Sequence, residues 1–353
     1  MPAPRLIPEC APQSGVILTW PHAASDWRDS LAEVEPLYTQ VVKAIIRHEQ
    51  VLIVCYDAQH ILHVKQQLAD SQVTLSRVRL VAVATNDTWV RDYGPLAVHN
   101  GQSLSLINFM FDGWGGKFAA ALDNAVSAAL DAAGVFQSHG LQQQSLVLEG
   151  GAIDTDGCGT LLATTRCLLD AGRNPTMDRQ ALEKSLQQCL GIERILWLDH
   201  GFIQGDDTDG HVDMLARFCS PHDIAYTQCS DVHDEQHAAL LSMEQQLQTF
   251  TDSGGTAYRL HALPLPAPFY SGAGTRLPAS YANFLIINNA VLLPVYDDPA
   301  DEEARRVLAQ CFPGRDIVAV NCLPLIAQHG SLHCASLQLA AGILGPVAEC
   351  VQP

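Results

Sequence analysis

Three polar stretches of the 353-residue chain combine titratable side chains with glycine turns, and each of them could carry chemistry. The first covers residues 86–95 and places Trp89, Arg91 and Asp92 directly after an apolar run. An indole face beside a carboxylate binds a guanidinium or an amine well, because the cation contacts the ring face and a charged hydrogen-bond acceptor together. If no ligand binds there, the stretch is a solvated loop with an ion pair between Arg91 and Asp92.

The second stretch covers residues 205–213 and reads Gly-Asp-Asp-Thr-Asp-Gly-His-Val-Asp. It fails as a calcium loop, because a register with Gly210 at the turn leaves glycine and alanine where the first and last ligands belong. On a strand, His211 and Asp213 would point to one face, which pairs an acid/base side chain with a carboxylate. The alternative is a surface hairpin with an Asp-Gly turn.

The third stretch, residues 329–334, ends in a cysteine. A cysteine attacks as a thiolate, and a nearby histidine or cationic substrate favours that form, although free cysteines are more often simply buried. His333 would point away from Cys334 on a strand, so His211 is the better partner. Glu149 ends an apolar run before two glycines; it either faces solvent or orients a histidine at a pocket.

The elements between these stretches must bring them together. β-branched and aliphatic runs predict strands at 16–20, 51–56, 78–83, 104–109, 145–148, 194–198, 212–218, 284–287, 291–295 and 317–322. Apolar residues at helical spacing predict helices at 31–50, 117–133, 177–190, 231–250 and 301–311.

A unit of hairpin, helix and closing strand recurs along the chain. One copy spans 152–198 and a second spans 281–322, with looser copies that start near Pro95 and His211. The unequal spacing indicates a structural repeat and not a solenoid array. The sequence has neither G-x-G-x-x-G after a strand nor a Walker motif, which disfavours a doubly wound nucleotide fold. A ring of such units would form one domain, so we expect a single catalytic domain over residues 1–353.

Composition narrows the class of protein. Twenty Lys and Arg against 38 Asp and Glu give a net charge of −18, which disfavours a nucleic-acid partner and suits a cationic substrate. No run reaches the roughly 18 apolar residues of a membrane span, and no secretory signal is recognisable. The eleven cysteines are scattered and lack a Cys-x-x-Cys pair, so we expect a cytoplasmic protein with no metal.

Several motifs, taken in order, resemble the agmatine deiminase and bacterial peptidyl-arginine deiminase family. They are GVILTWPHAASDW at 15–27, WVRDYGP at 89–95, FDGWGGK at 111–117, LEGG at 148–151, GDDTDGHVD at 205–213 and the Leu-His-Cys that ends at Cys334. The resemblance spans nearly the whole chain. It implies the pentein fold, an α/β five-bladed propeller with pseudo-fivefold repeats and a site in its central channel. It also implies a homodimer that needs no cofactor.

The same resemblance assigns roles to the polar residues. Cys334 would be the nucleophile, His211 the general acid/base and Glu149 its partner, while Asp92 and Asp213 would hold a guanidinium. Cys334 would attack the guanidinium carbon and displace ammonia. Water would then hydrolyse the covalent amidino intermediate to a ureido product.

The far end of the substrate decides which guanidino compound reacts. Agmatine is favoured, giving N-carbamoylputrescine and ammonia, because Asp207 matches the acidic position of agmatine-specific members, and Trp89 would pack on the alkyl chain. Free or peptidyl arginine would need a cation or an open groove; Arg217 could supply the cation, since a strand from His211 puts both on one face. Residues 328–336 depart from the Gly-Gly-Gly-Asn-Ile-His-Cys-Ile-Thr pattern of agmatine deiminases.

Functions besides deimination stay open. An amidinotransferase would use the same thiol but pass the amidino group to an amine. A binding protein for cationic metabolites would use Trp89, Asp92 and Asp213 as a cage without chemistry, and in a structural protein these residues would be scattered over the surface. A segment rich in Pro and Gly, residues 263–278, is a candidate loop to close over a site.

Overall fold

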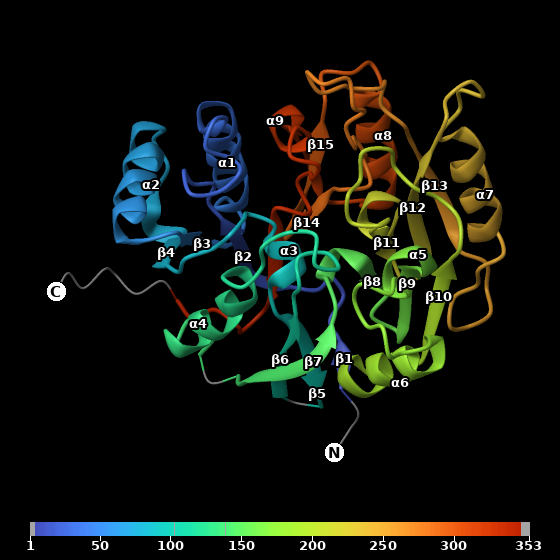
Figure 1. The fold of residues 1–353 in the computed structure, drawn as a ribbon, viewed down its shortest axis with the longest axis horizontal. Helices are drawn as coiled ribbons and strands as arrows, with labels where there is room; N and C mark the ends of the chain where they lie inside the picture. Colours follow the sequence, from blue (N-terminus) through green and yellow to red (C-terminus); the bar gives the residue numbers. More distant parts are fainter. Residues whose placement is uncertain (1–3, 102, 138, 347–353) are drawn as a thin grey trace.

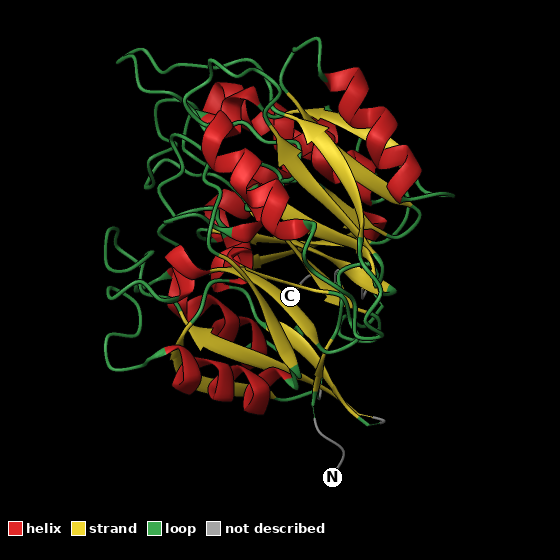
Figure 2. Cartoon of the chain, turned by 90° about the vertical axis from the view of Figure 1, so that its right-hand side faces the viewer, coloured by secondary structure: helices red, strands yellow, loops and turns green. Residues whose placement is uncertain are grey.

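The computed structural model describes residues 4–101, 103–137 and 139–346 of the chain. The strands in these residues form five separate sheets, two of four strands and three of three strands. Figure 1 shows the sheets side by side, with most of the longer helices toward the outside of the view. Figure 2 shows the same separation from the side. The expected mixed α/β class is confirmed, and none of the described sheets closes on itself.

One pattern of pairing recurs in all five sheets, namely an antiparallel pair followed by a parallel partner. In the sheet that matches the first predicted repeat, β8 (Ile153–Thr155) pairs antiparallel with β9 (Thr160–Thr164), and β9 pairs parallel with β10 (Arg194–Leu198). Helices α5 (Thr165–Leu168) and α6 (Arg179–Leu190) lie between the parallel strands in the chain, as expected for a crossover connection.

Three further sheets repeat this order of two antiparallel strands, a helix and a parallel strand, each within one continuous stretch of the chain. The first holds β5 (Leu96–Asn100), β6 (Ser103–Met110), α4 (Val126–Ala132) and β7 (Leu141–Val147), with β1 (Arg5–Leu6) added at its edge. The second holds β11 (Ala216–Ser220), β12 (Asp223–Gln228), α7 (His237–Leu247) and β13 (Arg259–Pro264). The third holds β14 (Leu285–Ile287), β15 (Ala290–Val295), α8 (Asp301–Cys311) and β16 (Asp316–Asn321).

The fifth sheet joins segments from the two ends of the described chain. β17 (Ser336–Ala340) pairs antiparallel with β2 (Gln13–Thr19), and β2 pairs parallel with β3 (Gln50–Cys55) across helix α1 (Leu31–Ile45). Helix α2 (Ala58–Asp70) then leads to β4 (Val78–Ala82), the edge strand. Sequence periodicity does not predict the pairing of β17 with β2. This pairing places the segment that carries Cys334 beside strand β2, near the start of the described chain.

Two predicted elements are wrong in ways that matter for the site. The predicted strand at 212–218 begins only at Ala216, because Val212–Met214 form a 3-10 turn, η4. The predicted helix at 117–133 contains only the 3-10 turn η2 (Asp123–Ala125) and α4. Helix α2 is absent from the prediction, since among its residues only Val64 and Leu68 are buried and the apolar signal is weak.

The core divides into a large cluster that extends through most of the sheets and a smaller one beneath β5 to β10. Within the described residues, no helix is both long and apolar enough to span a bilayer. Several short helical segments lie between the strands along the chain: η1 (Leu75–Arg77), α3 (Val90–Tyr93), η3 (Gly150–Ala152) and α9 (Leu323–Ile326). Figure 1 shows α3 near the middle of the view. The turns α3 and η4 both contact η3, so the polar residues that they carry lie close to one another.

Candidate active site

A cavity of about 400 Å³ gathers residues from all three predicted stretches. Six of the seven predicted site residues line it: Trp89, Asp92, Asp207, His211, Asp213 and Cys334. The seventh, Glu149, lies outside the lining but close to His211. The predicted polar residues are therefore not scattered over the surface, as a structural protein with chance motifs would require.

A close approach of short turns holds the carboxylates in place. Asp92 lies in α3, and its Oδ1 accepts a hydrogen bond of 2.9 Å from the backbone N–H of Gly151 in η3. A Cβ atom on Gly151 would lie 2.7 Å from His211 Nδ1, 2.8 Å from Asp92 Oδ1 and 3.1 Å from Asp213 Oδ2. Only glycine fits at this point, which accounts for the second glycine of the LEGG motif.

Asp92 is buried and anchored by an indole. Trp114 Nε1 donates to Asp92 Oδ2 at 3.0 Å, and His211 Nδ1 lies 3.6 Å from Asp92 Oδ1. Burial raises the pKa of Asp92 well above its usual value, and the negative charges of Asp213 and Glu149 raise it further. A cation entering the cavity would stabilise the ionised form. Trp114 belongs to the FDGWGGK motif, but the motif alone assigns it no role.

The pKa of Asp213 is shifted in the opposite direction from that of Asp92. Burial acts to raise its pKa, but the hydrogen bond and charge of His333 outweigh burial, so the pKa lies below its usual value. His333 Nδ1 is 2.7 Å from Asp213 Oδ2. The other oxygen, Oδ1, has no hydrogen-bond partner among the described residues and is available to a ligand. The strand on which we expected His333 and Cys334 is wrong, since both residues lie in a turn, and the His333 ring contacts Asp213.

The cysteine lies between an amide and a carboxylate. Asn283 Nδ2 donates to Cys334 Sγ at 3.2 Å, and Sγ lies 3.6 Å from Asp213 Oδ2. Burial raises the pKa of the Cys334 thiol well above its usual value, and the charges of Asp213 and Asp92 raise it further. The thiol is therefore protonated while the cavity holds no cation. Asn283 Oδ1 also accepts from the backbone N–H of His333, so it shapes the turn; no sequence pattern assigns it this role.

His211 is a buried, neutral imidazole. Neither ring nitrogen has a hydrogen-bond partner among the described residues, and burial lowers its pKa to about 3. It precedes η4, so the expected strand with His211 and Asp213 on one face is wrong; the turn brings both to the cavity instead. A neutral ring with unpaired nitrogens can accept a proton from a reacting group.

Glu149 lies near His211 but is held by another partner. Both of its oxygens accept from Arg173 Nε, at 2.8 and 3.0 Å, and both side chains are fully buried. One ligand atom each of Glu149, Cys167 and His211 lies within 4.8 Å of the others, the spacing of a metal site. The guanidinium of Arg173 already neutralises the carboxylate there, which opposes a second cation. No sequence pattern singles out Arg173.

The far end of the cavity is acidic. Burial and the negative charge of Asp206 raise the pKa of Asp207 to about 6, in spite of an opposing contribution from His329. Lys117 Nζ donates to the backbone oxygen of Asp207 at 2.7 Å. Trp89 is buried and packs against Trp27 with ring centroids 5.7 Å apart. Thr275, from the predicted loop, also lines the cavity.

Arg217 does not reach the cavity, so its predicted role as a cation for an arginine carboxylate is wrong. Its side chain is buried and donates to Glu9 at 2.5 Å and to Asp154 at 3.1 Å. Its guanidinium also lies 4.9 Å from the ring centroid of Phe284. The strand that carries Arg217 starts after η4, which breaks the alternation on which the expectation rested.

The chain is similar in sequence to known deiminases over nearly its full length. A sequence model of the Porphyromonas-type peptidyl-arginine deiminase family matches residues 5–339. The chain belongs to this family. Another member of the wider group, the agmatine deiminase of Stutzerimonas stutzeri (strain A1501), is 33% identical over 357 residues, which cover 94% of each chain.

Solved structures agree with this family membership. A crystal structure from Porphyromonas gingivalis superposes with a TM-score of 0.90 at 41% identity, over 97% of this chain and 100% of that one. The agmatine deiminase of C. jejuni with substrate bound superposes with a TM-score of 0.88 at 34% identity, over 96% of this chain and 97% of that one. The deiminase family that the motifs implied is thus supported over nearly the full length, together with the mixed α/β fold of its solved structures.

Proposed function

We propose that the protein hydrolyses the guanidinium of agmatine to N-carbamoylputrescine and ammonia. The observation that carries this proposal is the charge of the cavity around Cys334. Six aspartates line it, whereas no lysine or arginine does within the described residues: Asp26, Asp87, Asp92, Asp206, Asp207 and Asp213. Such a lining suits a substrate with a cation at each end. Relatives named agmatine deiminase support the same substrate.

Asp92 and Asp213 serve as the binding groups for the guanidinium. Asp213 is ionised beforehand, and the substrate's charge favours ionisation of Asp92 as it enters. Two carboxylates fix the plane of the guanidinium through paired hydrogen bonds, which exposes its central carbon to Cys334. The same positive charge favours the thiolate, so the nucleophile forms when the substrate is present.

His211 carries the protons. The neutral ring takes the thiol proton, the sulfur forms a bond to the guanidinium carbon, and the imidazolium returns the proton to the amino group that leaves as ammonia. His211 then takes a proton from water, whose oxygen attacks the amidino carbon. The carbon–sulfur bond breaks, and the ureido product and thiolate separate. These steps need only the residues already described.

The arrangement of the five sheets supports a more specific proposal about the fold. The five sheets with one shared pairing pattern support a five-bladed propeller, in which the cavity is the central channel of one catalytic domain over residues 1–353. We also propose that the reaction takes place in the cytoplasm and that the protein works as a homodimer.

A substrate panel with a sulfur-to-oxygen variant tests the function. Agmatine, free arginine, a peptide ending in arginine and methylated arginines would be scored for ureido product and ammonia, with Cys334→Ser beside the wild type. The half-buried Cys10, outside the cavity lining, offers Cys10→Ser as the matched control. We expect agmatine turnover in the wild type and Cys10→Ser only.

Each different outcome would point to a different function. Preference for arginine or its peptides would replace agmatine as the substrate. A product that keeps the amidino group on an added amine would indicate an amidinotransferase. Binding of agmatine that Cys334→Ser preserves, without turnover by the wild type, would indicate a binding protein.

A further inference from the structure

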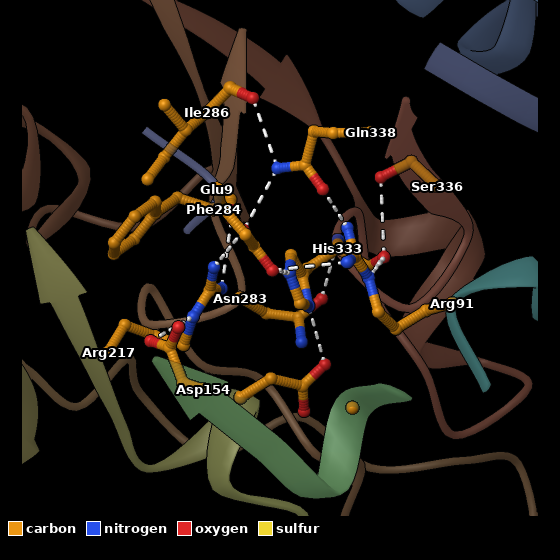
Figure 3. Close-up of polar contacts among 12 residues, drawn as sticks. Glu9, Arg91, Asp154, Arg217, Asn283, Phe284, Ile286, His333, Ser336 and Gln338 are labelled. Atoms are coloured by element: carbon orange, nitrogen blue, oxygen red, sulfur yellow. Dashed lines mark hydrogen bonds and ion pairs between the residues drawn. The ribbon is translucent and has the colours of Figure 1, made fainter. Parts of the chain in front are cut away.

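A largely buried ion cluster includes His333, the residue that directly precedes Cys334. Its centre is Glu9, from the segment that precedes β2, and four side chains donate to the Glu9 carboxylate (Figure 3). Their distances to Glu9 are 3.1 Å from Arg91, 2.5 Å from Arg217, 2.8 Å from His333 and 2.9 Å from Gln338. We call these five residues the Glu9 cluster.

His333 connects this cluster to the cavity. Its Nε2 lies 2.8 Å from Glu9 Oε1, and its Nδ1 lies 2.7 Å from Asp213 Oδ2. A neutral imidazole carries one N–H, so it can donate to only one of two carboxylates. Two such short contacts with ionised carboxylates require a proton on both nitrogens. The geometry therefore fits a ring that donates from both nitrogens, one to each carboxylate.

The pKa values of both carboxylates are lowered in spite of burial. Burial acts to raise the pKa of Glu9, but the charges of Arg217, His333 and Arg91 hold it well below its usual value. The pKa of Asp213 is also lowered, as described above. Apart from the two carboxylates that it contacts, His333 is surrounded at longer range by charged or titratable groups: Arg91 and Arg217 flank Glu9, and Asp92, His211 and Cys334 flank Asp213.

We propose that Glu9 is a positioning residue for deimination: it keeps His333 charged, and His333 in turn fixes Asp213 as an ionised, correctly oriented acceptor for the guanidinium. This inference rests on the proposed function for its catalytic consequence. Glu9 itself touches neither the cavity nor Cys334, since the cavity lining does not include it. Its contact is with His333, the partner of Asp213, which makes the effect separable from direct binding.

The variant Glu9→Gln tests this role while keeping the shape of the side chain. Without the Glu9 anion, His333 can lose a proton, and Asp213 loses its cationic partner. We expect the acidic limb of the kcat/KM profile for agmatine to move up by about one pH unit and kcat/KM at pH 7 to fall about tenfold. The change should fall mainly on KM, because the weakened contact already acts in the bound ground state.

Asp154→Asn is the matched control. Asp154 also pairs with Arg217 in the same buried region, but it contacts neither His333 nor Asp213. If the cluster acts only by holding the fold together, both variants should lower the melting temperature and the activity alike, with no movement of the acidic limb. That pattern, or an equal movement in both variants, would overturn the proposal.

The charge of His333 can be read without any turnover. In the wild type labelled with ¹⁵N-histidine, we expect both ring nitrogens of His333 to carry protons at pH 7, with the signals assigned by their loss in His333→Asn. In Glu9→Gln, one nitrogen should lose its proton. A neutral His333 in the wild type would refute the proposal even if Glu9→Gln failed to fold. If His333 carries both protons but the protein deiminates no substrate, the proposed arrangement of charges is supported and the proposed function is rejected.

Discussion

Cys334 Sγ lies 3.6 Å from Oδ2 of Asp213, so the nucleophile faces an anion and not a cation. Cysteine nucleophiles are usually activated by a neighbouring positive charge. Here the pKa of the thiol is raised by burial and by the two aspartates, and the positive charge must come from the substrate. We therefore expect the Cys334 thiol to react slowly with oxidants and alkylating reagents until a cation occupies the cavity.

Replacing Asp213 should separate thiol reactivity from catalysis. In Asp213→Asn the anion beside Cys334 is lost, which lowers the pKa of the thiol, and we expect alkylation by iodoacetamide at pH 7.5 to become about tenfold faster. Agmatine turnover should fall at least about 100-fold, because one of the two guanidinium acceptors is gone. Mass spectrometry of the labelled peptide, with Cys334→Ser as the blank, measures the first effect. Slower alkylation in Asp213→Asn would contradict the account.

The buried neutral His211 should make stability depend on pH. Its pKa is about 3 in the folded protein and near 6.5 when unfolded, so the unfolded chain takes up a proton first as pH falls. The contribution of His211 is present above pH 6.5 and is lost progressively below it, by about 2 kcal/mol at pH 5. Urea unfolding at pH 7.5 and pH 5 should show a smaller loss in His211→Gln than in the wild type. An equal loss in both would mean that His211 is not buried in its neutral form.

A methyl group at Gly151 should damage the site while leaving the fold. The added Cβ would push against Asp92 Oδ1 and His211 Nδ1 at 2.8 and 2.7 Å. We expect kcat/KM of Gly151→Ala to fall about 100-fold, because displacements near 1 Å disturb the alignment of reacting groups. Gly272→Ala is the control, since a Cβ there meets nothing within 4 Å. Full activity in Gly151→Ala would show that the turns are looser than described.

Asp207 should recognise the amine end of the substrate. We expect Asp207→Asn to raise KM for agmatine about tenfold, equivalent to about 1.4 kcal/mol, with little change in kcat. An alkylguanidine of the same length without the amine should bind both forms equally. Asp26→Asn, at another point of the lining, is the matched variant. If the amine-free compound were affected as strongly as agmatine, Asp207 would act on the guanidinium end.

Local patterns made much of this structure predictable. The recurring hairpin, helix and strand follow from apolar periodicity, and the helix at Asp301–Cys311 and the strand at Arg194–Leu198 have the predicted bounds. The polar residues of the site stand in short motifs, and six of the seven residues predicted from these motifs line one cavity. Their catalytic roles remain predictions that the experiments above address.

The errors share one physical cause. Strand alternation misplaces Arg217 and gives the wrong backbone conformation for Asp213 and His333, because turns interrupt the strands there and a turn redirects every side chain that follows. The partners of His333 and Arg217 include Glu9, which is remote in sequence and stands in no motif. Contacts such as Asn283 with Cys334 depend on how separate sheets meet, which periodicity within one segment does not encode.

The pairing of β17 with β2 bears on when the enzyme can first work. The cysteine lies just before the last described strand, and that strand is held by one of the earliest. A nascent chain that has not yet reached Cys334 already contains every strand of the other four sheets, but it lacks both the sulfur that we propose as the nucleophile and the strand β17 that pairs with β2. On the proposed function, catalytic competence therefore arrives in one step, when this segment is made, and translation products that stop before Cys334 would be inactive.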